Sequence, residues 1–149
     1  MSYLYLDSSI LVSLAVEDAR NTVSIRKTIE KHKTIGTSEI TVVEAQAGLI
    51  SQLGKNQNLL SNAEQNLNRI LGSMNLFSVN SIVLGSARSL VKQYRASVGL
   101  RSMDAIHLAT AKIISQSSGD QRPVELNYLT SDKKQHAAFT AEGYVGELI

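Results

Sequence analysis

The sequence predicts an α/β fold in which one parallel β-sheet lies between helices, in three α/β/α layers. Short apolar segments at residues 3–6 and 126–129, bounded by polar residues, have the length of buried strands. Longer segments between them, such as residues 40–50, repeat apolar residues at helical spacing. Strands that alternate with helices imply right-handed crossovers between parallel strands. A single proline in 149 residues leaves room for long regular elements.

Length and composition limit the class of protein. A chain of 149 residues is expected to form one domain, residues 1–149, and its 43% hydrophobic and 19% charged residues are ordinary for a globular protein. Every apolar run is shorter than the roughly 18 residues of a membrane span. Asp7 lies where the apolar core of a signal peptide would be, so the N-terminus is not expected to be a signal peptide. The absence of cysteine excludes disulfides and thiolate metal sites. We therefore expect a cytoplasmic protein with no membrane partner, and the net charge of +2 by itself says little about nucleic acid.

The N-terminal segment combines a strand, an acid and a helix start. Residues 3–6 are expected to form a strand, and Ser8 or Ser9 to cap a helix that begins at Ile10. Asp7 lies where the strand ends, and the carboxyl ends of parallel strands face the crevice where ligands bind. Asp7 is therefore a candidate functional acid, although capping of the helix explains a carboxylate there equally well.

Two long helices separated by a short break are expected in the middle of the chain. Thr41 and Glu44 have the spacing of a capping box, so Glu44 has a structural explanation as well as a functional one. Residues 54–60 contain the break, and Ser61 and Glu64 form a second possible capping box that opens a helix to about residue 74. Together these helices would form a protruding hairpin.

The other expected elements continue the alternation. The first two are a helix capped by Asn21 or Thr22 that reaches Lys33, and a strand at 34–37 that is followed by the cap Ser38. After the helix pair, we expect a strand at 76–79, a helix that starts at Asn80 or Ser81 and precedes a turn at Gly99, and a helix at 102–114. The chain then continues with a polar loop at 117–123, a strand at 126–129, a helix at 137–142 and a last strand near the C-terminus.

Four acids occupy comparable places in this arrangement. Asp7 and Asp132 follow predicted strands, while Glu44 and Asp104 lie near the starts of predicted helices, so all four are expected at the carboxyl edge of the sheet. Carboxylates gathered in one crevice repel one another unless some are protonated or a hard cation is bound. Without cysteine or paired histidines, such a site suits Mg²⁺ or Mn²⁺ better than zinc.

A cation of this kind fits phosphodiester hydrolysis. Mg²⁺ held by carboxylates keeps several waters, of which one can act as the nucleophile while the metal neutralises charge on a phosphate. In-line attack by water would leave a 5′-phosphate and a 3′-hydroxyl and would not require the ribose 2′-hydroxyl. His32, His107 and His136 are isolated in the sequence, which disfavours a histidine-pair mechanism. We interpret His107 as a packing or orienting residue rather than a ligand.

The acidic motifs resemble those of the PIN-domain family, and the size and layout are similar to VapC-type toxins of bacterial and archaeal toxin–antitoxin pairs. Asp7 in Leu-Asp-Ser-Ser, Glu44 in Val-Val-Glu-Ala, Asp104 in Asp-Ala-Ile-His-Leu-Ala-Thr-Ala and Asp132 in Thr-Ser-Asp match the family's acids in order. The resemblance spans nearly the whole chain. It implies a PIN-like, Rossmann-like fold and a Mg²⁺- or Mn²⁺-dependent endoribonuclease that forms a homodimer and is silenced by a cognate VapB-type antitoxin.

The same resemblance assigns roles to individual residues. Asp7, Glu44 and Asp104 would be the principal metal ligands, whereas Asp132, the fourth catalytic acid, would act through water or a second metal. Ser9 and Thr130 would support the acids beside them. Arg101 and Lys133 adjoin the acids in sequence and are candidate contacts to RNA phosphates. Apolar residues near the interhelical break form either core or a dimer or antitoxin surface: Leu49, Ile50 and Leu53.

Two other classes of function fit part of the pattern. A catalytically inactive PIN-like interaction module would use the acids only to bind a basic segment of a partner. A receiver-like or phosphatase-like domain would use Asp7 as a phosphoacceptor, but Ser8 and Ser9 stand where a second nearby acid is generally needed.

Overall fold

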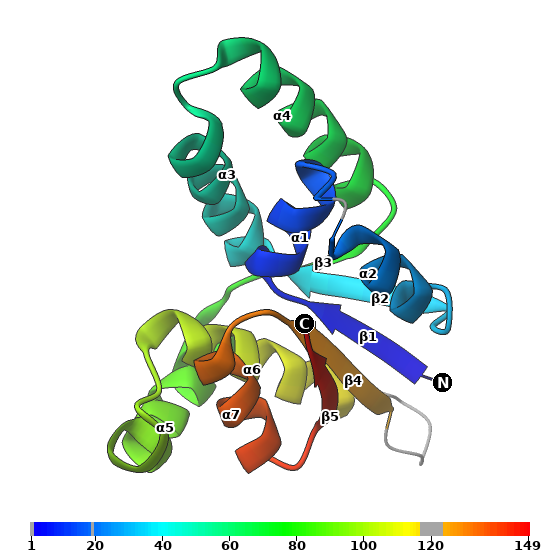
Figure 1. The fold of residues 1–149 in the computed structure, drawn as a ribbon. Coiled ribbons are helices and arrows are strands. Elements are labelled where there is room, and N and C mark those ends of the chain that lie inside the picture. The colour runs from blue at the N-terminus through cyan, green and yellow to red at the C-terminus, as the bar shows by residue number, and fades with distance from the viewer. Residues whose placement is uncertain (1, 19, 117–123) are drawn as a thin grey trace.

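Five parallel strands form one sheet in the order β3-β2-β1-β4-β5 (Figure 1). The computed structural model describes residues 2–18, 20–116 and 124–149. The strands are β1 (Ser2–Leu6), β2 (Thr34–Ser38), β3 (Asn75–Phe77), β4 (Glu125–Thr130) and β5 (Val145–Leu148). Because β1 lies at the centre and its neighbours are β2 and β4, the residues that follow β1 and β4 are adjacent at one edge of the sheet.

Strand β1 supplies both faces of the core. Tyr3 and Tyr5 pack on one face, against three helices: α5 (Ser81–Val98), α6 (Ser102–Gln116) and α7 (Lys133–Ala141). Leu4 and Leu6 pack on the other, against the remaining four: α1 (Ser8–Ala15), α2 (Thr22–Ile29), α3 (Glu39–Leu53) and α4 (Gln57–Leu71). Side chains alternate between the two faces of a strand, so this apolar run is buried throughout. The predicted three-layer α/β/α class is confirmed.

Helices α3 and α4 extend away from the sheet as a pair, as predicted (Figure 1). Neither predicted capping box forms. Ser38 caps α3, so Thr41 lies within the helix, buried. Helix α4 starts at Gln57 with Asn56 as its cap, which places Glu64 inside it, where its carboxylate accepts a hydrogen bond from Gln46. The capping-box prediction was wrong because an earlier polar residue satisfies each helix start first.

Other helix boundaries also differ from the sequence prediction. Asp7 itself caps α1 in place of Ser8 or Ser9. Helix α2 ends at Ile29, so its basic continuation to Lys33 lies outside the helix. Helix α7 begins at Lys133, earlier than predicted, because Asp132 caps it. As predicted, Ser38 and Asn80 cap their helices, and Gly99 ends α5 with the positive φ that favours glycine.

The predicted polar loop at 117–123 lies outside the described residues. Within the described part of the chain, no helix is both long enough and apolar enough to cross a membrane. Leu49 is fully buried in the core, whereas Ile50 is 52% exposed, so only the second is available to a partner.

Candidate active site

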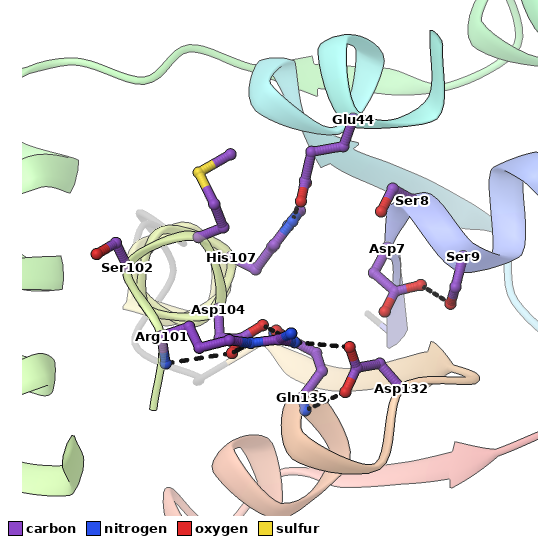
Figure 2. A pocket seen from close by; sticks show the side chains of 11 residues that line it. Asp7, Ser8, Ser9, Glu44, Arg101, Ser102, Asp104, His107, Asp132 and Gln135 are labelled. Atoms are coloured by element: carbon purple, nitrogen blue, oxygen red, sulfur yellow. Dashed lines mark hydrogen bonds and ion pairs between the residues drawn. The ribbon is translucent and has the colours of Figure 1, made fainter. Parts of the chain in front are cut away.

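A pocket of about 470 Å³ lies at the carboxyl edge of the sheet, between α3, α6 and the ends of β1 and β4 (Figure 2). All four acids singled out in the sequence line it. Its walls are formed by Asp7, Ser8, Ser9, Glu44, Arg101, Ser102, Met103, Asp104, His107, Asp132 and Gln135. The fold therefore brings together acids as far apart in the sequence as Asp7 and Asp132, as parallel topology predicts.

Asp7 is buried and held by neutral donors. Its side chain accepts the hydroxyl of Ser9 at 2.5 Å and the backbone N–H of Ile10 at 3.3 Å on Oδ1, and Thr130 donates to Oδ2. Burial raises the pKa of Asp7 above its ordinary value, and the hydrogen bonds from Ser9 and Thr130 only partly offset this. The ionised form of Asp7, at the end of the central strand, is therefore disfavoured by its burial.

Ser9 and Thr130 connect Asp7 to the loop that follows β4. The backbone N–H of Ser131 donates to Ser9 Oγ at 3.0 Å, and that of Asp132 donates to Thr130 Oγ1 at 3.0 Å. Each hydroxyl therefore donates to Asp7 and accepts from the loop. This arrangement fixes the rotamers of both hydroxyls and holds the start of α7 against the end of β1.

Glu44 is oriented by a buried histidine. His107 Nε2 lies 2.5 Å from Glu44 Oε1, and Nδ1 of the same ring lies 2.7 Å from the hydroxyl of Tyr5 and 3.5 Å from that of Thr41. His107 and Tyr5 are only 3% and 1% exposed, so the ring has little freedom to turn. His107 follows Asp104 by three positions on the same helix, but its ring is directed across the pocket to Glu44 (Figure 2).

Arg101 bridges the other two acids. Its Nε and Nη2 donate to the two oxygens of Asp104 at 2.7 and 3.1 Å, and Nη2 also donates to Asp132 Oδ2 at 2.7 Å. The second oxygen of Asp132 caps α7 through the N–H groups of Lys134 and Gln135. Partial burial raises the pKa of Asp132, but the bonds from Arg101 and these amides outweigh it and hold the pKa below its usual value.

Two further residues complete the description of the pocket. Lys133 is exposed at the first position of α7 and is not among the lining residues. Gln135 was missed by the sequence analysis: it lines the pocket, is 2% exposed, and its Nε2 has no hydrogen-bond partner among the described residues. Its position three residues after Asp132 was the available signal, because the first turn of a capped helix faces the same edge as its cap.

The donor chemistry of the pocket fits a hard divalent cation. Carboxylate and hydroxyl oxygens are the ligands that Mg²⁺ and Mn²⁺ prefer. In the described part of the chain, however, no three acid or histidine groups are grouped closely enough to hold a metal as they stand. The side chains of Asp104, Asp132 and Glu44 are engaged by Arg101 and His107, so cation binding requires some of them to exchange partners.

Several solved structures with a similar fold are toxins or toxin–antitoxin complexes. VapC20 from Mycobacterium tuberculosis, described as a toxin that cleaves the sarcin–ricin loop, has a TM-score of 0.67 and 15% identity over 95% of this chain and 96% of its own. VapBC2 from Rickettsia felis, solved with a fragment of its promoter DNA, has a TM-score of 0.65 and 16% identity over 100% and 99%. A toxin–antitoxin complex from Klebsiella pneumoniae has a TM-score of 0.62 and 21% identity over 90% of each chain.

The sequence itself also carries a family signature. No curated protein sequence matches the chain at the level of significance applied. The sequence model of the PIN domain matches residues 4–138, which include all four acids of the pocket. The chain therefore belongs to the PIN domain family.

Proposed function

We propose that this protein is a divalent-metal-dependent endoribonuclease and the toxin component of a type II toxin–antitoxin pair. The observation that carries the proposal is the convergence of Asp7, Glu44, Asp104 and Asp132 on one pocket. Membership of the PIN domain family and a fold shared with VapC proteins support it.

The four acids and the two hydroxyl groups that hold Asp7 have distinct roles in this proposal. Asp7, Glu44 and Asp104 would hold Mg²⁺ or Mn²⁺, which supplies an activated water and charge neutralisation at the phosphate. Asp132 caps α7 and borders the same pocket, where it is placed to orient a water or a second cation. Ser9 and Thr130 hold Asp7 in one rotamer, and they do so with neutral groups that leave its negative charge available.

RNA is the proposed substrate, and cations beside the pocket are placed to contact its phosphates. Arg101 lies in the pocket wall, and Lys133 is exposed beside Asp132, so two cations flank the acids where phosphates would lie. A similar fold belongs to a toxin described as cleaving the sarcin–ricin loop. Attack by water does not use the 2′-hydroxyl, so the proposed choice of RNA rests on that similar fold and not on the chemistry of the pocket.

A second copy and an antitoxin are the proposed protein partners. The helix pair α3–α4 exposes large apolar side chains: Val43 is 64% exposed, Ile50 52% and Leu59 50%. An exposed apolar surface on a projecting pair of helices is typical of a protein contact. Similar folds have been solved as complexes with antitoxins.

Cleavage of a cellular RNA pool tests this proposal. The purified full chain is incubated with total RNA in Mn²⁺, in Mg²⁺ and in EDTA, beside Asp7→Asn and Glu39→Gln. Asparagine also caps helices, so Asp7→Asn keeps the start of α1, and Glu39 is an exposed acid outside the pocket that serves as a matched control. We expect metal-dependent products from the wild type and Glu39→Gln that are absent from Asp7→Asn. Equal cleavage by Asp7→Asn would contradict the proposal.

A catalytically inactive interaction module remains the second candidate because of one observation. Three of the four acids are paired with Arg101 or His107, as they would be in a pocket that binds no metal. Tight binding of a basic partner segment, together with no cleavage of RNA in either metal, would favour this function.

A further inference from the structure

The two oxygens of Asp104 are both engaged by Arg101. Oδ2 accepts the backbone N–H of Arg101 at 3.2 Å and its Nε at 2.7 Å, while Oδ1 accepts Nη2 at 3.1 Å. This is a two-pronged guanidinium–carboxylate pair, which is more strongly oriented than a single ion pair. The Asp104 side chain is only 7% exposed, and the ion pair with Arg101 offsets the cost of burying its carboxylate.

Arg101 is also fixed from its other side. Its Nη2 donates to Asp132 Oδ2 at 2.7 Å, and Asp132 is itself held in place because its other oxygen caps α7. The guanidinium therefore lies between two carboxylates whose positions are set by the starts of α6 and α7 (Figure 2). A cation that approaches Asp104 meets a positive charge already in that position.

We propose that Arg101 is a built-in counter-cation, which pairs with Asp104 and Asp132 in the metal-free protein and which a divalent cation must displace from Asp104. This inference rests on the metal site of the proposed function. It predicts that Arg101 weakens metal binding while it stabilises the metal-free fold, and that the pocket fills first at Asp7 and Glu44, which have no arginine partner among the described residues.

The matched pair of variants is Arg101→Gln and Arg95→Gln. Arg95 lies at the C-terminal end of α5 and donates to the carbonyl of Leu100 at 3.3 Å, and it forms no ion pair with any described carboxylate. Both variants remove one positive charge from the same region. A difference between them reports the contact with Asp104 rather than the general change in charge.

Mn²⁺ binding, followed by the electron paramagnetic resonance of the free ion, is the first measurement and requires no catalysis. We expect Arg101→Gln to bind Mn²⁺ roughly three- to tenfold more tightly than wild type, since a partly exposed ion pair is worth on the order of 1 kcal/mol. Arg95→Gln should stay within about twofold of wild type. Equal or weaker binding by Arg101→Gln would overturn the proposal.

Thermal unfolding in EDTA gives a second readout that needs no metal. Arg101→Gln should unfold at a lower temperature than Arg95→Gln, because it leaves the buried carboxylate of Asp104 without its partner. Saturating Mn²⁺ should reduce this difference. If Arg101→Gln is as stable as Arg95→Gln in EDTA, the counter-cation role is refuted. RNA cleavage by the wild type in the same Mn²⁺ buffer tests the proposed function separately, so that the two failures are distinguishable.

Discussion

The two halves of the pocket hold their acids in different ways. On one side, Asp7 is fixed by hydroxyls and a backbone amide, and Glu44 by a buried histidine. On the other, Asp104 and Asp132 share the guanidinium of Arg101. The first half contains no arginine or lysine among its lining residues, whereas the acids of the second half share one guanidinium whose side chain is 47% exposed.

The two halves therefore differ in whether the groups that position an acid also offset its negative charge. Neutral donors can fix a carboxylate without competing with a metal for its charge, so the Asp7 half is ready for a cation at the cost of burying a carboxylate. On the other side, the guanidinium of Arg101 offsets the cost of burying Asp104, but it must move away from this carboxylate before a cation can bind there. The predictions that follow alter one half at a time.

Replacement of Asp104 by Asn should have the largest effect. It removes a proposed ligand and leaves Arg101 with only Asp132, so we expect RNA cleavage to fall at least roughly 100-fold, since even residues that only orient ligands are worth about 10- to 100-fold. Initial rates in Mn²⁺ measure the effect, with Glu39→Gln as the control. Cleavage within a factor of a few of wild type would show that the second half of the pocket is dispensable.

Loss of the histidine should have an intermediate effect on the first half. His107→Leu removes the partner of Glu44 Oε1, and we expect Mn²⁺ affinity and cleavage to decrease about 10- to 100-fold. Tyr5→Phe should cost less, because the hydroxyl of Thr41 remains near His107 Nδ1. Mn²⁺ titrations of both variants measure this order, and a larger loss in Tyr5→Phe than in His107→Leu would contradict the orienting role.

The stability of the metal-free protein should depend on pH through Asp7. Its folded-state pKa is raised by burial, so the folded protein binds this proton more tightly than the unfolded chain, whose Asp pKa is about 3.9. The resulting stabilisation is present below the unfolded pKa and is lost as pH rises through the folded pKa.

Asp7→Asn should therefore raise the Tm in EDTA at pH 7. The gain should vanish below about pH 3, where the wild-type carboxyl is protonated in both states. Thermal scans across this pH range test the sign, and a variant that is less stable than wild type at pH 7 would show that burial does not disfavour the charge.

The smallest effect is expected outside the pocket wall. Lys133 is exposed beside Asp132, so Lys133→Ala should weaken RNA binding modestly and reduce the slope of log K against log[salt] by about 0.7, the value for one contact with single-stranded nucleic acid. Binding of a short RNA by Asp7→Asn at several salt concentrations measures this without cleavage. An unchanged slope would place Lys133 away from the phosphates.

The fold and the four acids could be predicted from the sequence because both follow from local patterns. An apolar strand, an acid and a helix start are contiguous at Asp7 and again at Asp132, and parallel topology alone brings these positions together. The helix caps were harder to predict, because several polar residues near each helix start can serve as the cap, as Asn56 and Ser61 show for α4.

The partners of the acids could not be read from the sequence. The bond between His107 and Glu44 joins α6 to α3, and the bridge from Arg101 to Asp132 joins the start of α6 to the start of α7. Such contacts depend on side-chain direction across the pocket rather than on spacing along one helix. For this reason the pairing of Arg101 with Asp104 and Asp132 could not be predicted from its position in the sequence.

The chemistry of the cleaved ends tests the central claim most directly. An RNA cut by the wild type in Mn²⁺ is mapped, and the nucleotide that supplies the 2′-hydroxyl at the cleaved bond is replaced by its 2′-deoxy form. Hydrolysis by a metal-activated water predicts that the substituted RNA is still cut, that both RNAs carry a 5′-phosphate and a 3′-hydroxyl, and that EDTA abolishes both reactions. Cleavage that persists in EDTA, or that requires the 2′-hydroxyl and leaves a 2′,3′-cyclic phosphate, would contradict the account.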